Sequence, residues 1–151
     1  MRHNAMGRPI EVLMFEDNPD DILLTQEALV ETKVHVNLNV VQDGVEGLAF
    51  LRRQGRYTDV PRPDLILLDL NLPKKDGREV LAEIKTDASL KLIPVVVLTT
   101  SEADEDILKA YALHANCYIT KPVDLNQFIR VVKMIEDFWM TIVKLPQEGT
   151  R

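Results

Sequence analysis

The sequence has very little cysteine and no long apolar segment, and each absence excludes certain classes of protein. Cys117 is the only cysteine among 151 residues, which excludes an intrachain disulfide framework and a metal site built from clustered cysteines. The longest apolar runs, Leu65–Leu68 and Ile93–Leu98, are far shorter than the roughly 20 residues that span a bilayer. Residues 1–9 have no apolar core of the kind found in secretory signals. We therefore expect a cytoplasmic protein with no membrane partner.

Excess positive charge is lacking as well. Lys and Arg number 18 against 24 Asp and Glu, for a net charge of -6, which excludes an overall basic surface for nucleic acid. The residues after Pro122 are too few for a separate effector domain, and their charge is balanced, so we expect no nucleic acid partner. With 46% apolar residues, the chain can bury a full core in one domain. We expect this domain at residues 9–146, between a flexible N-terminus at 1–8 and a tail at 147–151.

Short apolar segments alternate with amphipathic ones along the chain. Five segments are typical of strands, at residues 10–15, 35–41, 65–68, 95–98 and 117–120. Apolar periodicity and capping patterns predict helices at residues 20–30, 45–53, 80–85 and 101–113, and from 124 towards Leu145. Short apolar strands that are each followed by a helix favour a parallel sheet covered on both faces. The expected fold class is therefore α/β, a doubly wound (βα)5 parallel sheet with an extended last helix.

Polar side chains follow four of the predicted strands, at the point where each strand ends. They are Glu16 and Asp17 after the first strand, Asp69 and Asn71 after the third, Thr99 to Ser101 after the fourth, and Lys121 after the fifth. In an open parallel sheet, ligands bind at the carboxyl ends of the strands. We therefore expect these side chains to converge on one edge of the sheet.

Such a site has a definite chemistry. Neighbouring carboxylates repel each other, and a hard divalent cation such as Mg²⁺ relieves that repulsion with oxygen ligands. Asp17, Asp69 and a backbone carbonyl would supply part of its ligand shell, and Lys121 would add a fixed positive charge. A phosphoryl group fits a site of this kind, because it brings several anionic oxygens.

Each of these residues also has a purely structural interpretation. Glu16 and Asp17 could cap the next helix, Asp69 could end its strand, and Lys121 could be an ordinary solvated lysine. The coincidence of all four strand ends favours a functional site.

Five stretches of the sequence resemble the receiver domains of two-component response regulators, over residues 9–145. They are Phe15–Pro19, Leu67–Pro73, Asp76–Gly77, Val97–Ser101 and Tyr118–Pro122. Residues 22–29, 41–46 and 71–81 resemble more narrowly the single-domain regulators paired with cyanobacterial phytochrome histidine kinases. The resemblance implies flavodoxin-like topology and a signalling protein rather than an enzyme, with a histidine kinase of the phytochrome type as partner.

The resemblance implies a role for each residue at the strand ends. Asp69 would accept a phosphoryl group from a kinase histidine. Mg²⁺ would be held by Asp17, Asp69 and the main-chain carbonyl of Asn71, with Glu16 acting mainly through water. Lys121 and Thr99 would contact the phosphoryl oxygens.

Further roles concern switching and the lifetime of the acyl phosphate. Thr99 would move towards the phosphoryl group and Tyr118 would enter the vacated space, changing the face formed by the helix after Ser101, the strand at 117–120 and the last helix. The Lys121–Pro122 bond would be cis. Asn71 and Ser101 would tune a slow autodephosphorylation.

The last predicted helix is apolar over an arc about twice the roughly 100° that an ordinary surface helix needs. Its exposed part predicts a partner, and a symmetric homodimer is the commonest assembly. A tail folded back on its own domain is the alternative. The dimer candidates are Val131, Met134, Phe138, Trp139, Ile142 and Leu145.

Three other functions compete with this interpretation. A haloacid-dehalogenase-type phosphatase needs a second acid two residues after its aspartate, where this chain has Asn71. A flavodoxin-like nucleotide binder needs a phosphate-binding loop where Glu16 and Asp17 would repel phosphate. A degenerate receiver would lack some of the site residues, and here all are present.

Overall fold

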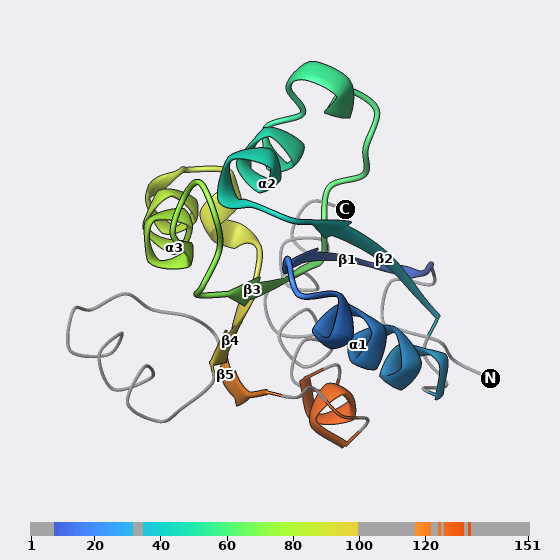
Figure 1. The fold of residues 1–151 in the computed structure, drawn as a ribbon. Coiled ribbons are helices and arrows are strands. Elements are labelled where there is room, and N and C mark those ends of the chain that lie inside the picture. The colour runs from blue at the N-terminus through green and yellow to red at the C-terminus, as the bar shows by residue number, and fades with distance from the viewer. Residues whose placement is uncertain are drawn as a thin grey trace.

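The structure, a computed structural model, describes residues 8–31, 35–99, 117–121, 124, 126–131 and 133. Within these residues, five parallel strands form one sheet in the order β2-β1-β3-β4-β5 (Figure 1). The strands are β1 (Ile10–Phe15), β2 (Val36–Val41), β3 (Leu65–Asp69), β4 (Val95–Thr99) and β5 (Cys117–Thr120). The order reverses between β1 and β3, which is the flavodoxin-like arrangement. The predicted α/β class, the doubly wound parallel sheet and all five strands are confirmed, whereas most of the predicted extended last helix lies outside the described residues.

Helices cover both faces of the sheet (Figure 1). The apolar side chains of α2 (Gly44–Leu51) and α3 (Gly77–Thr86) pack on one face. Those of α1 (Pro19–Glu31) and of the helical residues 126–131 pack on the other. Within the described part of the chain, no helix is both long and apolar enough to cross a bilayer. The helix predicted at residues 101–113 lies outside the described residues.

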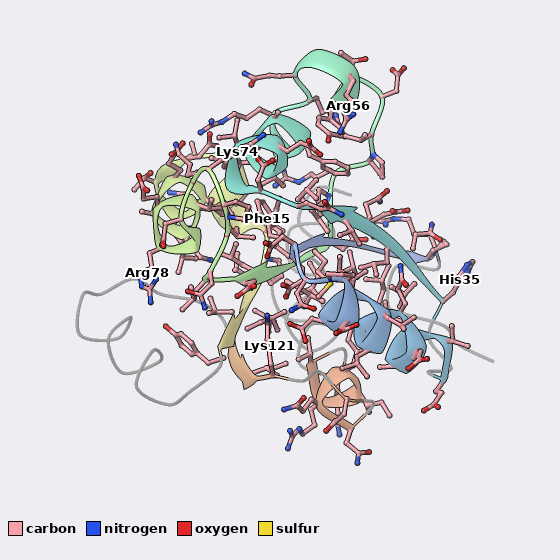
Figure 2. The ribbon with its side chains drawn as sticks, viewed as in Figure 1. Phe15, His35, Arg56, Lys74, Arg78 and Lys121 are labelled. Carbon is pink, nitrogen blue, oxygen red and sulfur yellow. The ribbon has the colours of Figure 1, made fainter. Side chains whose placement is uncertain are left out.

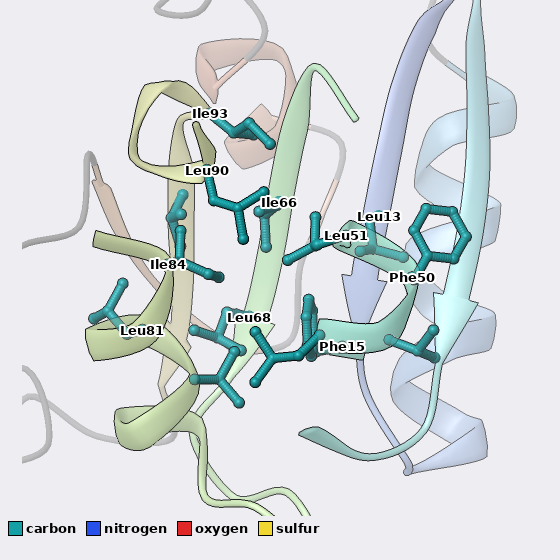
Figure 3. Packing of buried hydrophobic residues seen from close by; sticks show 14 of the residues in the cluster. Leu13, Phe15, Phe50, Leu51, Ile66, Leu68, Leu81, Ile84, Leu90 and Ile93 are labelled. Atoms are coloured by element: carbon teal, nitrogen blue, oxygen red, sulfur yellow. The ribbon is translucent and has the colours of Figure 1, made fainter. Parts of the chain in front are cut away.

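Alternate side chains of the central strands divide the interior into two clusters. Phe15 and Leu68 belong to the cluster under α2 and α3 (Figure 3). Met14 and Leu67, one position earlier on the same strands, belong to the cluster on the opposite face. Burial on both faces explains why these strands are continuously apolar in sequence.

Aspartate side chains cap the N-terminal ends of α2, α3 and the helical residues 126–131. The Asp43 side chain accepts a hydrogen bond from the Glu46 N–H at 2.7 Å and caps the N-terminus of α2. Asp124 and Gln127 form a reciprocal capping box, with N–H to side-chain oxygen distances of 2.8 and 3.1 Å. The carboxylate of Asp76 accepts from the N–H of Arg78, two residues later, and α3 begins at Gly77, before its predicted start at residue 80.

Two short 3-10 turns were not predicted, η1 (Gly55–Tyr57) and η2 (Leu90–Leu92). The sequence predicts the second helix over residues 45–53. That helix ends earlier, at Leu51, since Arg53 has a left-handed backbone with φ 54°. Gly55, with φ 58°, begins η1 instead.

Candidate functional site

Strand register brings the predicted site residues to one edge of the sheet. Phe15 of β1 pairs with Leu68 of β3, so Glu16 and Asp69 occupy equivalent positions just past this pair. Thr99 of β4 pairs with Thr120 of β5, which places Lys121 one residue beyond the same edge. The convergence predicted from the strand ends is therefore present for Glu16, Asp69 and Lys121.

Lys121 lies among three carboxylates. Its Nζ is 2.8 Å from Glu16 Oε1, 2.9 Å from Asp21 Oδ2 and 3.1 Å from Asp69 Oδ2. The ammonium donates hydrogen bonds to Asp21 and Asp69, and Figure 2 shows its side chain between the strand ends and α1. Burial lowers the pKa of Lys121, but the three carboxylates outweigh burial and raise that pKa above its ordinary value. Lys121 is therefore a fixed positive charge at this edge.

Glu16 is completely buried. Its Oε2 accepts a hydrogen bond from the Asn18 N–H at 3.2 Å, whereas Oε1 forms an ion pair with Lys121. The pKa of Glu16 is raised to about 7, because burial and the neighbouring Asp69 raise it by more than Lys121 lowers it. The Lys121 ammonium therefore compensates the charge of this buried carboxylate.

The donor set fits a divalent metal. Glu16, Asp17 and Asp69 each offer a carboxylate oxygen, and these oxygens lie within 4.8 Å of one another. Asp17 is exposed while the other two are buried, so the cluster is open to solvent on one side. Carboxylate oxygens are the preferred ligands of hard divalent cations.

The backbone after β3 holds Asp69 in place. The Asn71 N–H donates to Asp69 Oδ1 at 3.1 Å, so each oxygen of the Asp69 carboxylate accepts one hydrogen bond. Gly77, the first residue of α3, donates from its N–H to the Leu70 carbonyl at 3.0 Å. A Cβ on Gly77 would overlap with the Asp69 carbonyl oxygen. The start of α3 therefore packs directly on the backbone of Asp69.

Other predicted residues are described less fully. Tyr118 is half-buried and packs against the core cluster on the α2 and α3 face. Thr99 ends β4, but its side chain lies outside the described residues. Ser101 and Pro122 also lie outside them, and so does the predicted cis bond between Lys121 and Pro122. Five of the dimer candidates also lie outside them: Met134, Phe138, Trp139, Ile142 and Leu145.

Val131 corrects one prediction. Its side chain is only 3% exposed and packs in the core cluster that also contains Val12, Leu67 and Phe128. It therefore stabilises the chain's own interior and is not available to contact a second copy. The helical periodicity placed Val131 beside the apolar stripe correctly, but periodicity does not tell which part of a wide apolar face meets the sheet.

Asp21 is a site residue that the sequence analysis missed. It lies in the first turn of α1 and pairs with Lys121, 100 positions later in the chain. Its position four residues after Asp17 was the available signal, but acidic residues are also common in the first turn of any helix.

Comparisons with known proteins agree with this geometry. A sequence model of the response regulator receiver domain matches residues 12–133. The response regulator Rcp1 of Synechocystis sp. (strain ATCC 27184 / PCC 6803 / Kazusa) is 51% identical over 138 residues, which cover 91% of this chain and 94% of Rcp1.

Two solved structures are similar in both sequence and fold. The crystal structure of the phosphorylated cyanobacterial phytochrome response regulator RcpA has 55% identity and a TM-score of 0.73, covering 89% of this chain and 96% of RcpA. The Mn²⁺-bound form of Rcp1 has 51% identity and a TM-score of 0.71, with the same coverage of 89% and 96%. This chain therefore belongs to the response regulator receiver domain family, the phosphoacceptor proteins of two-component signalling, whose partners are histidine kinases.

Proposed function

We propose that Asp69 is the phosphoacceptor of this receiver domain and that Lys121 assists the transfer. The observation that carries this assignment is the contact between the Lys121 ammonium and Asp69 Oδ2 at 3.1 Å, beside a cluster of three carboxylates. Asp69 is the only one of the three that ends the central strand β3, and it is only 3% exposed.

The chemical step is an attack by a carboxylate oxygen of Asp69 on the phosphorus of a kinase phosphohistidine. An O–P bond forms as the N–P bond breaks, and the electron pair of that bond leaves with the imidazole. The Lys121 ammonium neutralises charge on the phosphoryl oxygens, which is most of what a protein can contribute to such a transfer. The Asn71 N–H keeps the carboxylate oriented through Oδ1.

We assign the metal position to Mg²⁺. Asp17, Asp69 and the main-chain carbonyl of Asn71 would hold it, with Glu16 acting mainly through water. When bound, the cation supplies further neutralisation of phosphoryl charge. The donor set and the Mn²⁺-bound form of the relative Rcp1 support a divalent cation at this position.

We infer that the partner is a histidine kinase of the phytochrome type, acting in the cytoplasm, where the ATP used by such kinases is available. The support is the 55% identity with the cyanobacterial phytochrome response regulator RcpA.

We further propose roles for the remaining predicted residues. Thr99 and Tyr118 would carry the switch, and Asn71 and Ser101 would tune a slow autodephosphorylation. The domain would span residues 9–146 and form a homodimer through its last helix.

Incubation with acetyl phosphate and Mg²⁺, followed by intact mass measurement, tests the phosphoacceptor. We expect the wild-type protein to gain the mass of one phosphoryl group and Asp69→Asn to gain none. Asp59→Asn, at an exposed aspartate, is the matched control and should behave as wild type. An adduct that persists in Asp69→Asn would refute the assignment, and continuous hydrolysis of the donor without an adduct would indicate a phosphatase.

A further inference from the structure

We infer that Asp21 is a positioning residue for the phosphoryl transfer, which holds the Lys121 ammonium at the site when a metal is bound. The inference rests on the proposed roles of Asp69 and Lys121. It goes beyond them because Asp21 lies on α1, outside the carboxylate cluster formed by Glu16, Asp17 and Asp69.

The contact between Asp21 and Lys121 is well defined. Asp21 Oδ2 accepts from Lys121 Nζ at 2.9 Å, and the two side chains are 25% and 12% exposed. Partial burial on both sides strengthens such a pair relative to a fully solvated one.

The backbone of Asp21 is anchored on both sides. Its N–H donates to the Asn18 side-chain oxygen at 3.2 Å. Its carbonyl accepts from the hydroxyl of Thr25 at 3.0 Å, and Thr25 is 1% exposed. Asp21 is thus a fixed anchor, whereas Lys121 has a flexible four-carbon stem that loses rotamer freedom when it is held.

Metal binding changes the balance among the three partners of Lys121. A divalent cation on the carboxylate cluster would neutralise Glu16 and Asp69 and would repel the ammonium. Asp21 is not a member of that cluster and would keep its full charge. It is therefore the partner that retains Lys121 beside Asp69 in the metal-bound protein, ready for the incoming phosphoryl oxygens.

The first test measures phosphoryl uptake from acetyl phosphate at saturating Mg²⁺ for Asp21→Asn, Asp21→Glu and Asp20→Asn. Asp20 is the matched control, because it is an exposed aspartate in the same helical turn. We expect Asp21→Asn to slow uptake about tenfold, less than the loss of about 100-fold that a misplacement of 1 Å can cause. Asp21→Glu should restore most of the rate.

The sign of the effect separates positioning from a general charge effect. Removing a negative charge near the site weakens the repulsion between the protein and the anionic donor. It should therefore speed uptake slightly, as we expect for Asp20→Asn. Slower uptake in Asp21→Asn alone therefore supports positioning. In a Lys121→Ala background, the Asp21→Asn substitution should have no further effect. An equal rate in Asp21→Asn and Asp20→Asn, or a loss that persists without Lys121, would overturn the inference.

A second measurement is independent of phosphorylation. The ¹⁵N-labelled ammonium of Lys121, assigned by its absence in Lys121→Ala, should give a slowly exchanging NMR signal in wild-type protein with chelator and with Mg²⁺. In Asp21→Asn the signal should persist with chelator and be lost with Mg²⁺. If it persists with Mg²⁺, Asp21 does not hold Lys121. If wild-type protein takes up no phosphoryl group, the proposed function fails, and this signal still decides the role of Asp21.

Discussion

The single ammonium of Lys121 forms ion pairs with three carboxylates, those of Glu16, Asp21 and Asp69. The carboxylates therefore outnumber the ammonium, and in the absence of a metal a bound proton relieves part of the repulsion. Burial favours the protonated form of Glu16, whose pKa is raised to about 7. We therefore expect metal binding to displace this proton.

In metal-free protein we expect the free energy of unfolding to fall as the pH rises from about 5 to about 8. The pKa of Glu16 rises from 4.5 to about 7 on folding, so between these values the folded state binds more protons than the unfolded state. The stabilisation is complete below pH 4.5 and is lost as the pH rises past 7. Its magnitude is about 3 kcal/mol.

Urea unfolding with a chelator at both pH values measures this effect. Glu16→Gln is the control, because a glutamine has a similar size and does not titrate. The variant should show a smaller pH dependence than wild type, and Mg²⁺ should flatten the dependence of wild type by favouring ionised carboxylates. Equal pH dependence in the two proteins under metal-free conditions would contradict the prediction.

The connection between β3 and α3 is the element that positions the phosphoacceptor. Asp69 is the last residue of β3, and Gly77 begins α3 so close to it that no side chain fits between them. The N–H of Gly77 also donates to the carbonyl of Leu70. The helix start therefore supports the backbone from which the Asp69 carboxylate projects.

We expect Gly77→Ala to reduce the free energy of unfolding by about 1–3 kcal/mol, the usual cost of forcing an extra group into a packed position. It should also slow phosphoryl uptake, because the displaced backbone carries Asp69.

Gly55→Ala is the comparison, since Gly55 has open space around it but a left-handed φ of 58°. That variant should lose about 1 kcal/mol through backbone strain and keep its rate of phosphoryl uptake. Denaturant unfolding and intact mass kinetics separate the two outcomes, and a normal uptake rate in Gly77→Ala would show that α3 does not position Asp69.

At the scale of the whole molecule, helices pack on both faces of the sheet, α2 and α3 on one face and α1 and residues 126–131 on the other. The helical residues 126–131 have a buried side and an exposed side. Val131 is 3% exposed in the core, whereas Ile129 is 46% exposed. Ile129 is therefore an exposed apolar side chain on the helical residues that the structure describes here.

We expect the intact protein to sediment as a dimer at micromolar concentration, and Trp139→Ala to weaken the dimer. A buried interface tryptophan typically contributes about 2 kcal/mol, which corresponds to a roughly 30-fold rise in the dissociation constant. Lys133→Ala, at an exposed position, should leave assembly unchanged. Sedimentation velocity with and without Mg²⁺ and beryllofluoride provides the measurement. Monomers under both conditions in the wild-type protein would refute the homodimer.

Local patterns in the chain predicted the strands and the polar residues at the strand ends. These features depend on neighbours a few positions away, or on the rule that parallel strands align their carboxyl ends. Glu16, Asp69 and Lys121 could therefore be assigned to one site before any coordinates were known.

Contacts between distant segments could not be predicted in this way. The pairing of Asp21 with Lys121 joins residues 100 positions apart, and it depends on how α1 packs beside the end of β5. The burial of Val131 and the start of α3 against Asp69 were likewise settled by packing in three dimensions. Periodicity shows that a helix has an apolar face, whereas the fit of side chains against the sheet determines which of those residues are buried.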